Sequence, residues 1–337
     1  MKKLNIIQLG IGHDHGTSGF NSILKQDDIF NVVGFAVPES ETERFADRIK
    51  EYRDDRKIPY YSIEEILNLP NIDAAIIESE EKNLTSLALM AAEKGLHIYV
   101  DKPGSANYSE FEKLVNTART KKLAFAMGYM YRYNPKVKEV MKKIKDGELG
   151  EIYCVEAHMD CEHIPEKREW LSQFPGGMLF FLGCHLIDLI YRIQGEPEEI
   201  IPLNCSTKFD NVNAEDYGMV VYKYHNGVSF AKTCANEIGG FRRRQLVICG
   251  TKGSIEIKPF EILTDERDML YTEMRETYKA EGWNSPGKQT KSEYFNRFDE
   301  MMRDFALVAL GEKENDYGYD YELGLYKLLL KSCGVKI

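Results

Sequence analysis

The stretch "QLGIGHDHGTSGF" at residues 8–20 contains two kinds of residue that could do chemistry, the first of them a glycine loop. Gly10, Ile11 and Gly12 follow a strand pattern and precede a helix pattern. Glycine permits the tight turn at position 10 and lets a phosphate approach the backbone at position 12. The segment therefore predicts a turn that binds a dinucleotide pyrophosphate, with a ligand-free strand–helix turn as the alternative.

The second kind of residue is a charged and imidazole-bearing run, His13-Asp14-His15, where such a turn usually has small residues. The third glycine of the fingerprint would fall at His15, whose side chain prevents the closest packing of helix on strand unless Gly16 takes over that role. Asp14 beside a pyrophosphate would be repelled unless a histidine or a cation offset its charge. We expect His13 and His15 to lie at the cofactor.

A lysine follows another buried strand in "HIYVDKPGS". Ligands of doubly wound folds bind at the carboxyl ends of the strands, where Asp101 and Lys102 would lie. A single lysine is usually solvated, but one placed between a strand end and Pro103 is less free. Beside a cationic nicotinamide ring a lysine gives up its proton more readily, which suits acid–base chemistry.

An alternation of strand and helix patterns over residues 1–125 predicts the sheet that would position these residues. We expect a Rossmann-type, doubly wound parallel sheet, an α/β fold that binds the dinucleotide. Residues 41–53 predict one charged helix, and Ser62 with Glu65 predicts a capping box at another.

The alternation of strand and helix patterns ends at residue 125. Residues 126–337 predict an α+β domain for substrate binding and oligomerisation. Its large open sheet should be mainly antiparallel, with hairpins at Asn226-Gly227 and Lys252-Gly253. A helix over 178–195 is inserted between the first two strands. The terminal helix is expected to pack back on the first domain.

Several segments in this order resemble the Gfo/Idh/MocA family of glucose-fructose oxidoreductases, inositol dehydrogenases and their relatives. The resemblance covers nearly the whole chain. It is carried by Gly10-x-Gly12, "DKP" at 101–103, "GYMYRYNP" at 128–135, "GELGEI" at 147–152, "GGMLFFLGCHLIDLIYRIQGEP" at 176–197 and "GTKGSIEI" at 250–257. It implies a nicotinamide cofactor, hydride transfer at a sugar or cyclitol hydroxyl carbon, and dimers or tetramers formed through the open sheet.

The resemblance also implies roles for individual residues. Lys102 matches the lysine that hydrogen-bonds the reacting hydroxyl, and His185 matches a histidine that is the general acid/base in many members, although a core histidine is the alternative. Asp188 shares the helical face of His185 and would orient its ring or anchor the helix. Arg132 and Asn134 match positions near the cofactor carboxamide and the substrate, or else pack the domain junction.

Other positions depart from the family pattern. Val37 stands where an acid at the end of the second strand would bind ribose, and Glu39 would reach a ribose hydroxyl or lie in solvent. Phe181 replaces the aspartate four residues before the histidine. In the family's T-P-x-x-x-H stretch, Ser79 stands for the threonine, Glu80 replaces the proline, and Leu84 replaces the histidine. We still expect Ser79 and Glu80 to lie at the cofactor.

The histidines raise the question of a metal. His13, His15, Glu78 and Glu80 should lie at strand ends of one sheet, and a second set should lead toward the same cleft: His158, Asp160, His163 and His185. Imidazoles and carboxylates suit zinc, manganese or iron. Their spacing matches no strong metal motif, so we assign no metal ligand and favour histidines that contact substrate or form caps.

Composition narrows the function classes. The chain has 337 residues, a net charge of −10 and a pI near 5.4, so no basic excess is available for nucleic acid. We expect no membrane segment, and we read the start as a buried strand rather than a signal peptide. The seven cysteines lack a C-x-x-C motif, which favours a reducing cytoplasm over disulfides.

These observations favour an NAD(P)-dependent oxidoreductase, with NAD preferred to NADP, acting on a polyhydroxylated small molecule as a cytoplasmic homodimer or homotetramer. A non-catalytic protein that senses a dinucleotide or a sugar is the alternative from another class. A metal-dependent lyase or hydrolase on the same scaffold is the weaker third reading.

Overall fold

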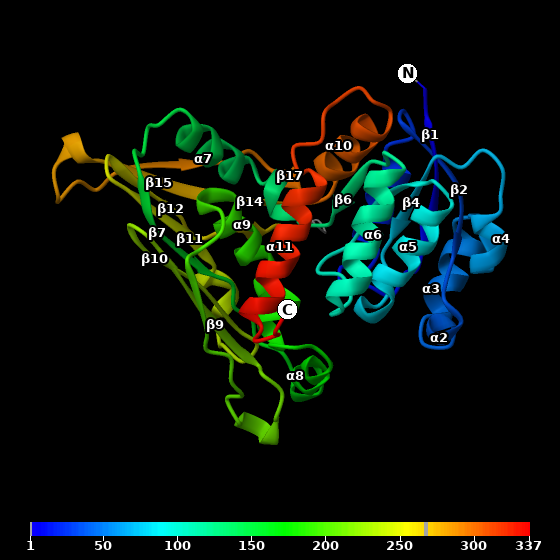
Figure 1. The fold of residues 1–337 in the computed structure, drawn as a ribbon, viewed down its shortest axis with the longest axis horizontal. Helices are drawn as coiled ribbons and strands as arrows, with labels where there is room; N and C mark the ends of the chain where they lie inside the picture. The colour runs from blue at the N-terminus through cyan, green and yellow to red at the C-terminus, as the bar shows by residue number, and fades with distance from the viewer. Residues whose placement is uncertain (1, 266–268) are drawn as a thin grey trace. The chain divides into compact units, whose positions relative to one another are not determined.

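The computed structural model describes residues 2–265 and 269–337, which divide into two compact units. The first unit comprises residues 1–129 and 298–323, and the second comprises residues 130–297 and 324–337. The chain thus leaves the first unit after residue 129 and returns to it for a helical segment near the C-terminus (Figure 1).

The first unit is built on a six-stranded parallel sheet in the order β3-β2-β1-β4-β5-β6, as the strand–helix alternation predicted. This is the doubly wound order in which the chain reverses direction between β1 and β4, so a ligand crevice is expected there. The strands are β1 (Leu4–Leu9), β2 (Phe30–Ala36), β3 (Tyr60–Tyr61), β4 (Ala74–Ile77), β5 (His97–Val100) and β6 (Phe125–Met127).

The helices that connect these strands are α1 (Ser18–Lys25), α2 (Glu39–Thr42), α3 (Ala46–Lys50), η1 (Glu51–Asp55), α4 (Ile63–Leu67), η2 (Glu81–Asn83), α5 (Leu84–Glu93) and α6 (Tyr108–Thr120). The segment that returns to this unit near the C-terminus adds α10 (Asp299–Ala309). The capping box is confirmed, because Ser62 accepts the amide of Glu65 while Glu65 accepts the amide of Ser62. The expected single helix over 41–53 is wrong: it breaks at Phe45, whose ring turns toward Gly12.

The second unit contains an eight-stranded sheet in the order β16-β15-β12-β11-β7-β10-β9-β8. Every pairing is antiparallel except that of β7 with β10, which confirms a mainly antiparallel sheet. Its strands are β7 (Ile152–His158), β8 (Glu199–Pro202), β9 (Tyr217–Tyr224), β10 (Gly227–Cys234), β11 (Gln245–Gly250), β12 (Gly253–Ile257), β15 (Glu273–Tyr278) and β16 (Lys288–Lys291). A small second sheet contains β13 (Ile262–Leu263), β14 (Met269–Tyr271) and β17 (Phe295–Asn296).

Both expected hairpins form, each with its turn one residue earlier than the sequence suggested. Tyr224 pairs with Gly227, so His225 and Asn226 make the first turn. Gly227 is required by packing, because a Cβ there would lie 1.9 Å from the carbonyl oxygen of Tyr153.

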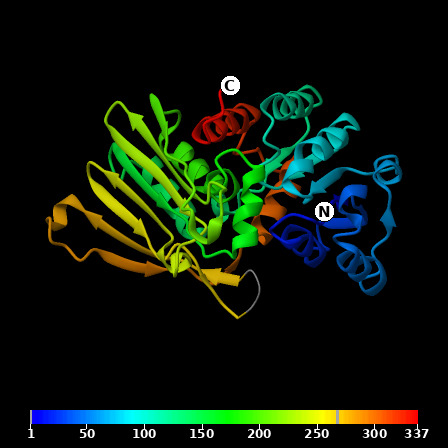
Figure 2. The same ribbon diagram turned by 90° about the horizontal axis from the view of Figure 1, so that it is seen from below.

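One face of this sheet is packed by helix. The predicted helix over 178–195 forms as a π-helical turn, η5 (Leu179–Gly183), followed by α9 (Cys184–Gln194), which lies along the sheet in Figures 1 and 2. Buried and part-exposed residues alternate along β9, so its other face is half-exposed. The remaining helices are η3 (Met130–Tyr133), α7 (Pro135–Lys145), α8 (Pro165–Trp170), η4 (Leu171–Gln173), η6 (Phe209–Asn211), η7 (Gly240–Arg243), η8 (Lys279–Glu281) and α11 (Tyr319–Ser332).

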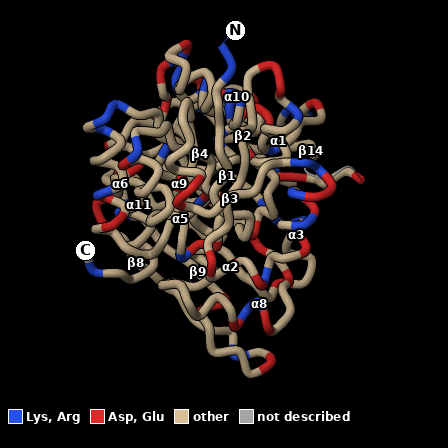
Figure 3. Tube along the Cα trace, turned by 90° about the vertical axis from the view of Figure 1, so that its right-hand side faces the viewer, with Lys and Arg blue, Asp and Glu red and all other residues tan. Residues whose placement is uncertain are grey.

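Basic and acidic residues are interspersed along the chain in Figure 3. Among the described residues, no helix is long and apolar enough to cross a bilayer. All seven cysteines are free thiols.

Candidate functional site

The glycine loop after β1 forms the tight turn that the sequence predicted. Gly10 has φ +79°, and a Cβ there would lie 2.5 Å from the Cβ of Ser79, at the end of β4. A Cβ on Gly12 would lie 2.6 Å from Oε2 of Glu41. A side chain at either position would collide with these neighbours, so glycine lets the turn pack closely against the residues that follow β2 and β4.

Helix α1 begins later than the fingerprint suggests. Residues 13–17 form turns, and the helix starts at Ser18. Gly16 adopts φ +64° within these turns, whereas Gly19 makes the close approach expected of the third glycine. A Cβ on Gly19 would lie 2.8 Å from Oε1 of Glu78 and 3.0 Å from Met302. The close packing of helix on strand therefore falls on Gly19.

Glu78 occupies the start of α1. Its Oε1 accepts the amide of Gly19 and its Oε2 accepts the amide of Phe20, each at 3.0 Å, while Gln8 donates to Oε2 at 3.1 Å. Burial and the charge of Asp101 raise the pKa of Glu78 to about 7, against the opposing effects of His13 and the two amides. The backbone donors that a helix N-terminus offers to an anion are thus taken by the protein's own carboxyl group.

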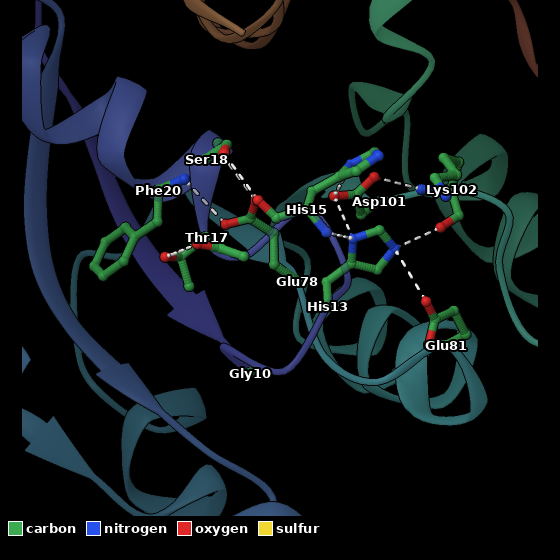
Figure 4. Close-up of polar contacts among 12 residues, drawn as sticks. Gly10, His13, His15, Thr17, Ser18, Phe20, Glu78, Glu81, Asp101 and Lys102 are labelled. Atoms are coloured by element: carbon green, nitrogen blue, oxygen red, sulfur yellow. Dashed lines mark hydrogen bonds and ion pairs between the residues drawn. The ribbon is translucent and has the colours of Figure 1, made fainter. Parts of the chain in front are cut away.

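His13, His15 and Asp101 form a compact cluster, shown in Figure 4. Oδ2 of Asp101 lies 3.0 Å from Nδ1 of both histidines. Nε2 of His13 lies 2.8 Å from the carbonyl oxygen of Lys102, and Oε1 of Glu81 is 3.9 Å away. The amide of His15 also donates to Nδ1 of His13, at 3.1 Å. The rings of His13 and His15 meet edge to face, with centroids 4.6 Å apart.

The two histidines respond to this environment in opposite ways. Burial opposes a charge on His13, but Asp101 and Glu81 outweigh it and raise its pKa to about 9. For His15 burial dominates and lowers its pKa to about 4. Burial would raise the pKa of Asp101, yet His13 and His15 hold it well below its usual range. At neutral pH the cluster therefore holds a carboxylate together with one positive charge on its histidines.

Lys102 is placed by its backbone in this cluster. Its amide donates to Oδ1 of Asp101 at 2.7 Å, and its carbonyl oxygen contacts His13. The residue is only 1% exposed, so it lies inside the sheet edge and not in solvent. The structure thus brings together four residues that the sequence assigned to the cofactor: His13, His15, Asp101 and Lys102.

Glu41 is a site residue that the sequence reasoning missed. It is fully buried, and its Oε1 accepts hydrogen bonds from the Ser79 hydroxyl, the Glu80 amide at 3.1 Å and the Asn83 amide group at 2.6 Å. Burial raises its pKa. Its Oε2 has no hydrogen-bond partner among the described residues. The only sequence signal was an acidic residue in the first helix after β2, a place where acids are common.

The acids named from the sequence near Glu41 lie elsewhere. Glu39 is exposed, and Val37 belongs to a buried apolar cluster. Glu80 follows the end of β4, as expected, and its carboxylate pairs with Arg44 and with Lys82. Its contact with the cofactor stays a prediction.

These residues fit a dinucleotide. Gly10 and Gly12 form the tight turn after β1, and the unpartnered Oε2 of Glu41 offers an acceptor for a hydroxyl group. The phosphates would be held by the turn itself, since Glu78 fills the first amides of α1.

In the second unit, His185 is the second residue of α9 and is buried at 1% exposure. Its ring meets that of Tyr131 edge to face, with centroids 4.9 Å apart. The Tyr131 hydroxyl donates to Glu261 at 2.8 Å, and burial together with that carboxylate raises the pKa of Tyr131.

Asp188 and Arg132 form a buried ion pair. Nε and Nη2 of Arg132 lie 2.7–3.1 Å from the two carboxylate oxygens of Asp188. Both side chains are at most 4% exposed. The pair ties α9 to η3, which agrees with the anchoring reading of Asp188 and with the packing reading of Arg132. Asn134 caps α7 by accepting the amides of Lys136 and Val137, and it also donates to Thr272.

Phe181 lies in an aromatic group in place of the family's carboxylate. Its ring centroid is 5.2 Å from that of Trp170 and 6.3 Å from that of Phe174, and the Lys167 ammonium lies 4.7 Å above it. One turn before His185, this unit thus presents apolar and not acidic surroundings.

In the remaining histidine set, His158 is the last residue of β7. Asp160, two residues beyond it, pairs with Lys232 at 2.9 Å. Burial lowers the pKa of His158. His158, His163 and His185 all belong to the second unit, and their convergence with His13 and His15 stays a prediction.

Comparison with known proteins extends over both units. Residues 5–129 match the family described as oxidoreductase, NAD-binding Rossmann fold, and residues 137–256 match the GFO/IDH/MocA C-terminal domain. Trans-1,2-dihydrobenzene-1,2-diol dehydrogenase of Mus musculus is 25% identical over 241 residues, which is 68% of this chain and 70% of the relative.

Two solved structures share the fold at low sequence identity. One is a putative NADPH-dependent oxidoreductase from Desulfitobacterium hafniense, with a TM-score of 0.79, 18% identity, and coverage of 99% of this chain and 95% of that chain. The other is aldose-aldose oxidoreductase from Caulobacter crescentus, with a TM-score of 0.78, 17% identity and full coverage of both chains (100%). The matches to both halves show that this chain belongs to the Gfo/Idh/MocA family of NAD-binding oxidoreductases.

Proposed function

We propose that this protein is an NAD-dependent dehydrogenase that oxidises a secondary alcohol of a small polyol or vicinal diol. The observation that supports it most is Lys102, buried at the end of β5 with its backbone fixed by His13 and Asp101. In an open parallel sheet this edge is where ligands bind.

The reaction requires a hydride and a proton to leave the substrate. A bound nicotinamide supplies the acceptor for the hydride lost from the alcohol carbon. The ammonium of Lys102, after giving up its proton, would accept the hydroxyl proton as the carbonyl forms. His185 stays a predicted general acid/base, on the strength of its match to the family histidine.

Glu41 supports NAD over NADP. A carboxylate at the adenosine end of a Rossmann site accepts ribose hydroxyls and repels a 2′-phosphate. Glu41 has an unpartnered oxygen facing Gly12, whereas Arg44, the nearby cation that could bind a phosphate, already pairs with Glu80. Replacing Glu41 with Gln should therefore reduce the preference for NAD over NADP.

The substrate class is supported by the relatives and by Phe181. The mouse relative is named for a cyclic diol, and the Caulobacter protein for aldoses. The aromatic group of Phe181, Trp170 and Phe174 favours a substrate with an apolar face over one with many charged groups.

The test is a turnover assay of the full chain with NAD and with NADP over a panel of cyclic diols, cyclitols and aldoses. Appearance of reduced nicotinamide absorbance with NAD and a panel member supports the proposal. Tight dinucleotide binding without turnover across the panel would instead support the sensing alternative. Cytoplasmic location and a dimer or tetramer formed through the open sheet also stay predictions.

A further inference from the structure

We propose that His13, His15 and Asp101 bind a divalent transition-metal ion such as Zn²⁺ at the carboxyl edge of the first sheet. One ligand atom of each residue lies within 4.8 Å of the other two. The three atoms are Nδ1 of both histidines and Oδ2 of Asp101 (Figure 4).

The spacing of these atoms is that of neighbouring ligands around one ion. Each Nδ1 lies 3.0 Å from Oδ2 of Asp101. Ligands about 2.1 Å from a metal, at angles between octahedral and tetrahedral, are roughly 3.0–3.4 Å apart. Three protein ligands leave at least one position for water or for a substrate oxygen, which is the pattern of a reactive metal site and not of a closed structural one.

The surroundings orient the ligands. Nε2 of His13 is 2.8 Å from the carbonyl oxygen of Lys102, so its proton can donate there, and an ion at Nδ1 would replace the hydrogen bond that this nitrogen accepts from the His15 amide at 3.1 Å. Oδ1 of Asp101 accepts the Lys102 amide at 2.7 Å, which leaves Oδ2 for the ion. Metal-binding histidines usually donate their second ring N–H to a carbonyl or carboxylate in this way. The backbone of one residue, Lys102, thus fixes two of the three ligands.

Buried carboxyl groups around this point favour a cation, against the opposing charge of the Lys102 ammonium. Asp101 is fully buried, and two more buried carboxyl groups lie beside the cluster, Glu78 through its contacts with the loop and Glu81 at 3.9 Å from His13. The His15 side chain is 12% exposed, which gives an ion a route from solvent. Two imidazoles with one carboxylate select a transition metal over Mg²⁺ or Ca²⁺, whose preferred ligands are all oxygen.

Protons are the competing explanation. A proton on His13 and another on His15 would satisfy the same contacts with Asp101 without any metal. An ion with an open position beside Lys102 would in addition bind a substrate oxygen, a role that protons cannot take. The proposal does not rest on the dehydrogenase activity, since it concerns the binding of the ion alone.

The experiment uses the full chain purified without a histidine tag and stripped with a chelator. Zn²⁺ is titrated by calorimetry into the wild type, His15→Ala and His225→Ala. His225 is an exposed histidine of the second unit and serves as the matched control. We expect one equivalent to bind the wild type and the control equally, and His15→Ala to lose at least about 100-fold in affinity. A wild type that binds no Zn²⁺, or binds it no better than His15→Ala does, overturns the proposal.

A second measurement needs no variant. X-ray absorption at the zinc edge of the wild type should show two imidazole groups in the ligand shell, and a shell without imidazole overturns the proposal. Binding of NAD⁺ to the stripped protein is measured separately, so a failed metal site and a failed dinucleotide site are told apart.

Discussion

Oε1 of Glu78 accepts the amide hydrogen of Gly19 at 3.0 Å, joining two residues that lie 59 positions apart in the chain. The carboxyl group at the end of β4 thereby caps α1 from outside the helix. An ordinary Rossmann helix would offer these amides to a phosphate. Here the protein supplies its own anion, and the titration of Glu78 becomes coupled to the stability of the fold.

That coupling predicts a pH dependence. The pKa of Glu78 is raised from 4.5 to about 7 in the folded protein, so the folded state holds this proton more tightly than the unfolded chain does. Its contribution is therefore fully present below pH 4.5 and is lost as the pH rises through 7. We expect Glu78→Gln to remove a decline of roughly 1–3 kcal/mol in unfolding free energy over this window, measured by urea denaturation at a series of pH values.

The control for that measurement is Glu65→Gln. Bonds from Ser62 lower the pKa of Glu65, so its contribution is present above the ordinary pKa and is lost in acid. The two substitutions should change the pH profile in opposite directions. Identical profiles for Glu78→Gln and the wild type would contradict the proposed coupling.

Gly10→Ala should disrupt the loop. The residue has φ +79°, and its Cβ would lie 2.6 Å from Cα and 2.8 Å from the amide nitrogen of Ser79, atoms that cannot move without moving β4. Gly95→Ala is the matched control, because φ is +86° there and nothing lies within 4 Å of the added Cβ. We expect about 1–2 kcal/mol of destabilisation for Gly95→Ala from backbone strain alone. Gly10→Ala should lower the free energy of unfolding clearly more than Gly95→Ala does, measured in the same thermal or urea melt. Equal losses for the two variants would show that the loop is not tightly packed on Ser79.

Lys102→Met tests the proposed chemistry. Methionine retains the apolar stem inside the sheet edge but cannot exchange a proton. We expect turnover to fall by about 10²–10⁴-fold, while NAD⁺ binding measured by calorimetry changes little. Lys94→Met, at an exposed lysine that contacts Asn68, should leave both quantities unchanged. Full turnover in Lys102→Met would remove the lysine from the mechanism.

Arg132→Met should destabilise the second unit. It leaves the buried carboxylate of Asp188 without its two-point partner, a change that costs roughly 3–5 kcal/mol. Arg119→Met breaks an exposed pair with Asp320 and should cost about 0–1 kcal/mol. If Arg132→Met combined with Asp188→Leu recovers much of the melting temperature, the loss came from the unpaired charge; no recovery would assign it to packing.

Local features of this protein could be predicted from the sequence because neighbouring residues produce them. The period of apolar residues gave the strands and helices, Ser62 and Glu65 gave a helix start, and Gly10 gave a turn at the end of β1. The resemblance to a family, built on segments in a fixed order, is confirmed over both halves of the chain.

What the tertiary structure decided depends on contacts between distant residues. Glu41 is one of several acids in its segment. It is the acid held in the candidate site, because Ser79, Glu80 and Asn83 donate hydrogen bonds to it across the sheet. The helix expected over 41–53 is interrupted at 43–45, and the Phe45 ring there packs beside Gly12, which lies 33 residues away in the chain.

Residues 8–20 contain both features set by local sequence and features set by the tertiary structure. Gly10 and Gly16 are dictated locally by a backbone angle that only glycine adopts without strain, whereas Gly12 and Gly19 are required by close contacts with distant residues. The cluster that the histidines of this stretch form depends on Asp101, which lies 86 residues from His15 in the chain. The two residues are adjacent in space because β1 and β5 end at the same edge of one parallel sheet. Sequence periodicity reports which face of an element is buried, but only the folded sheet determines which side chains meet at its edge.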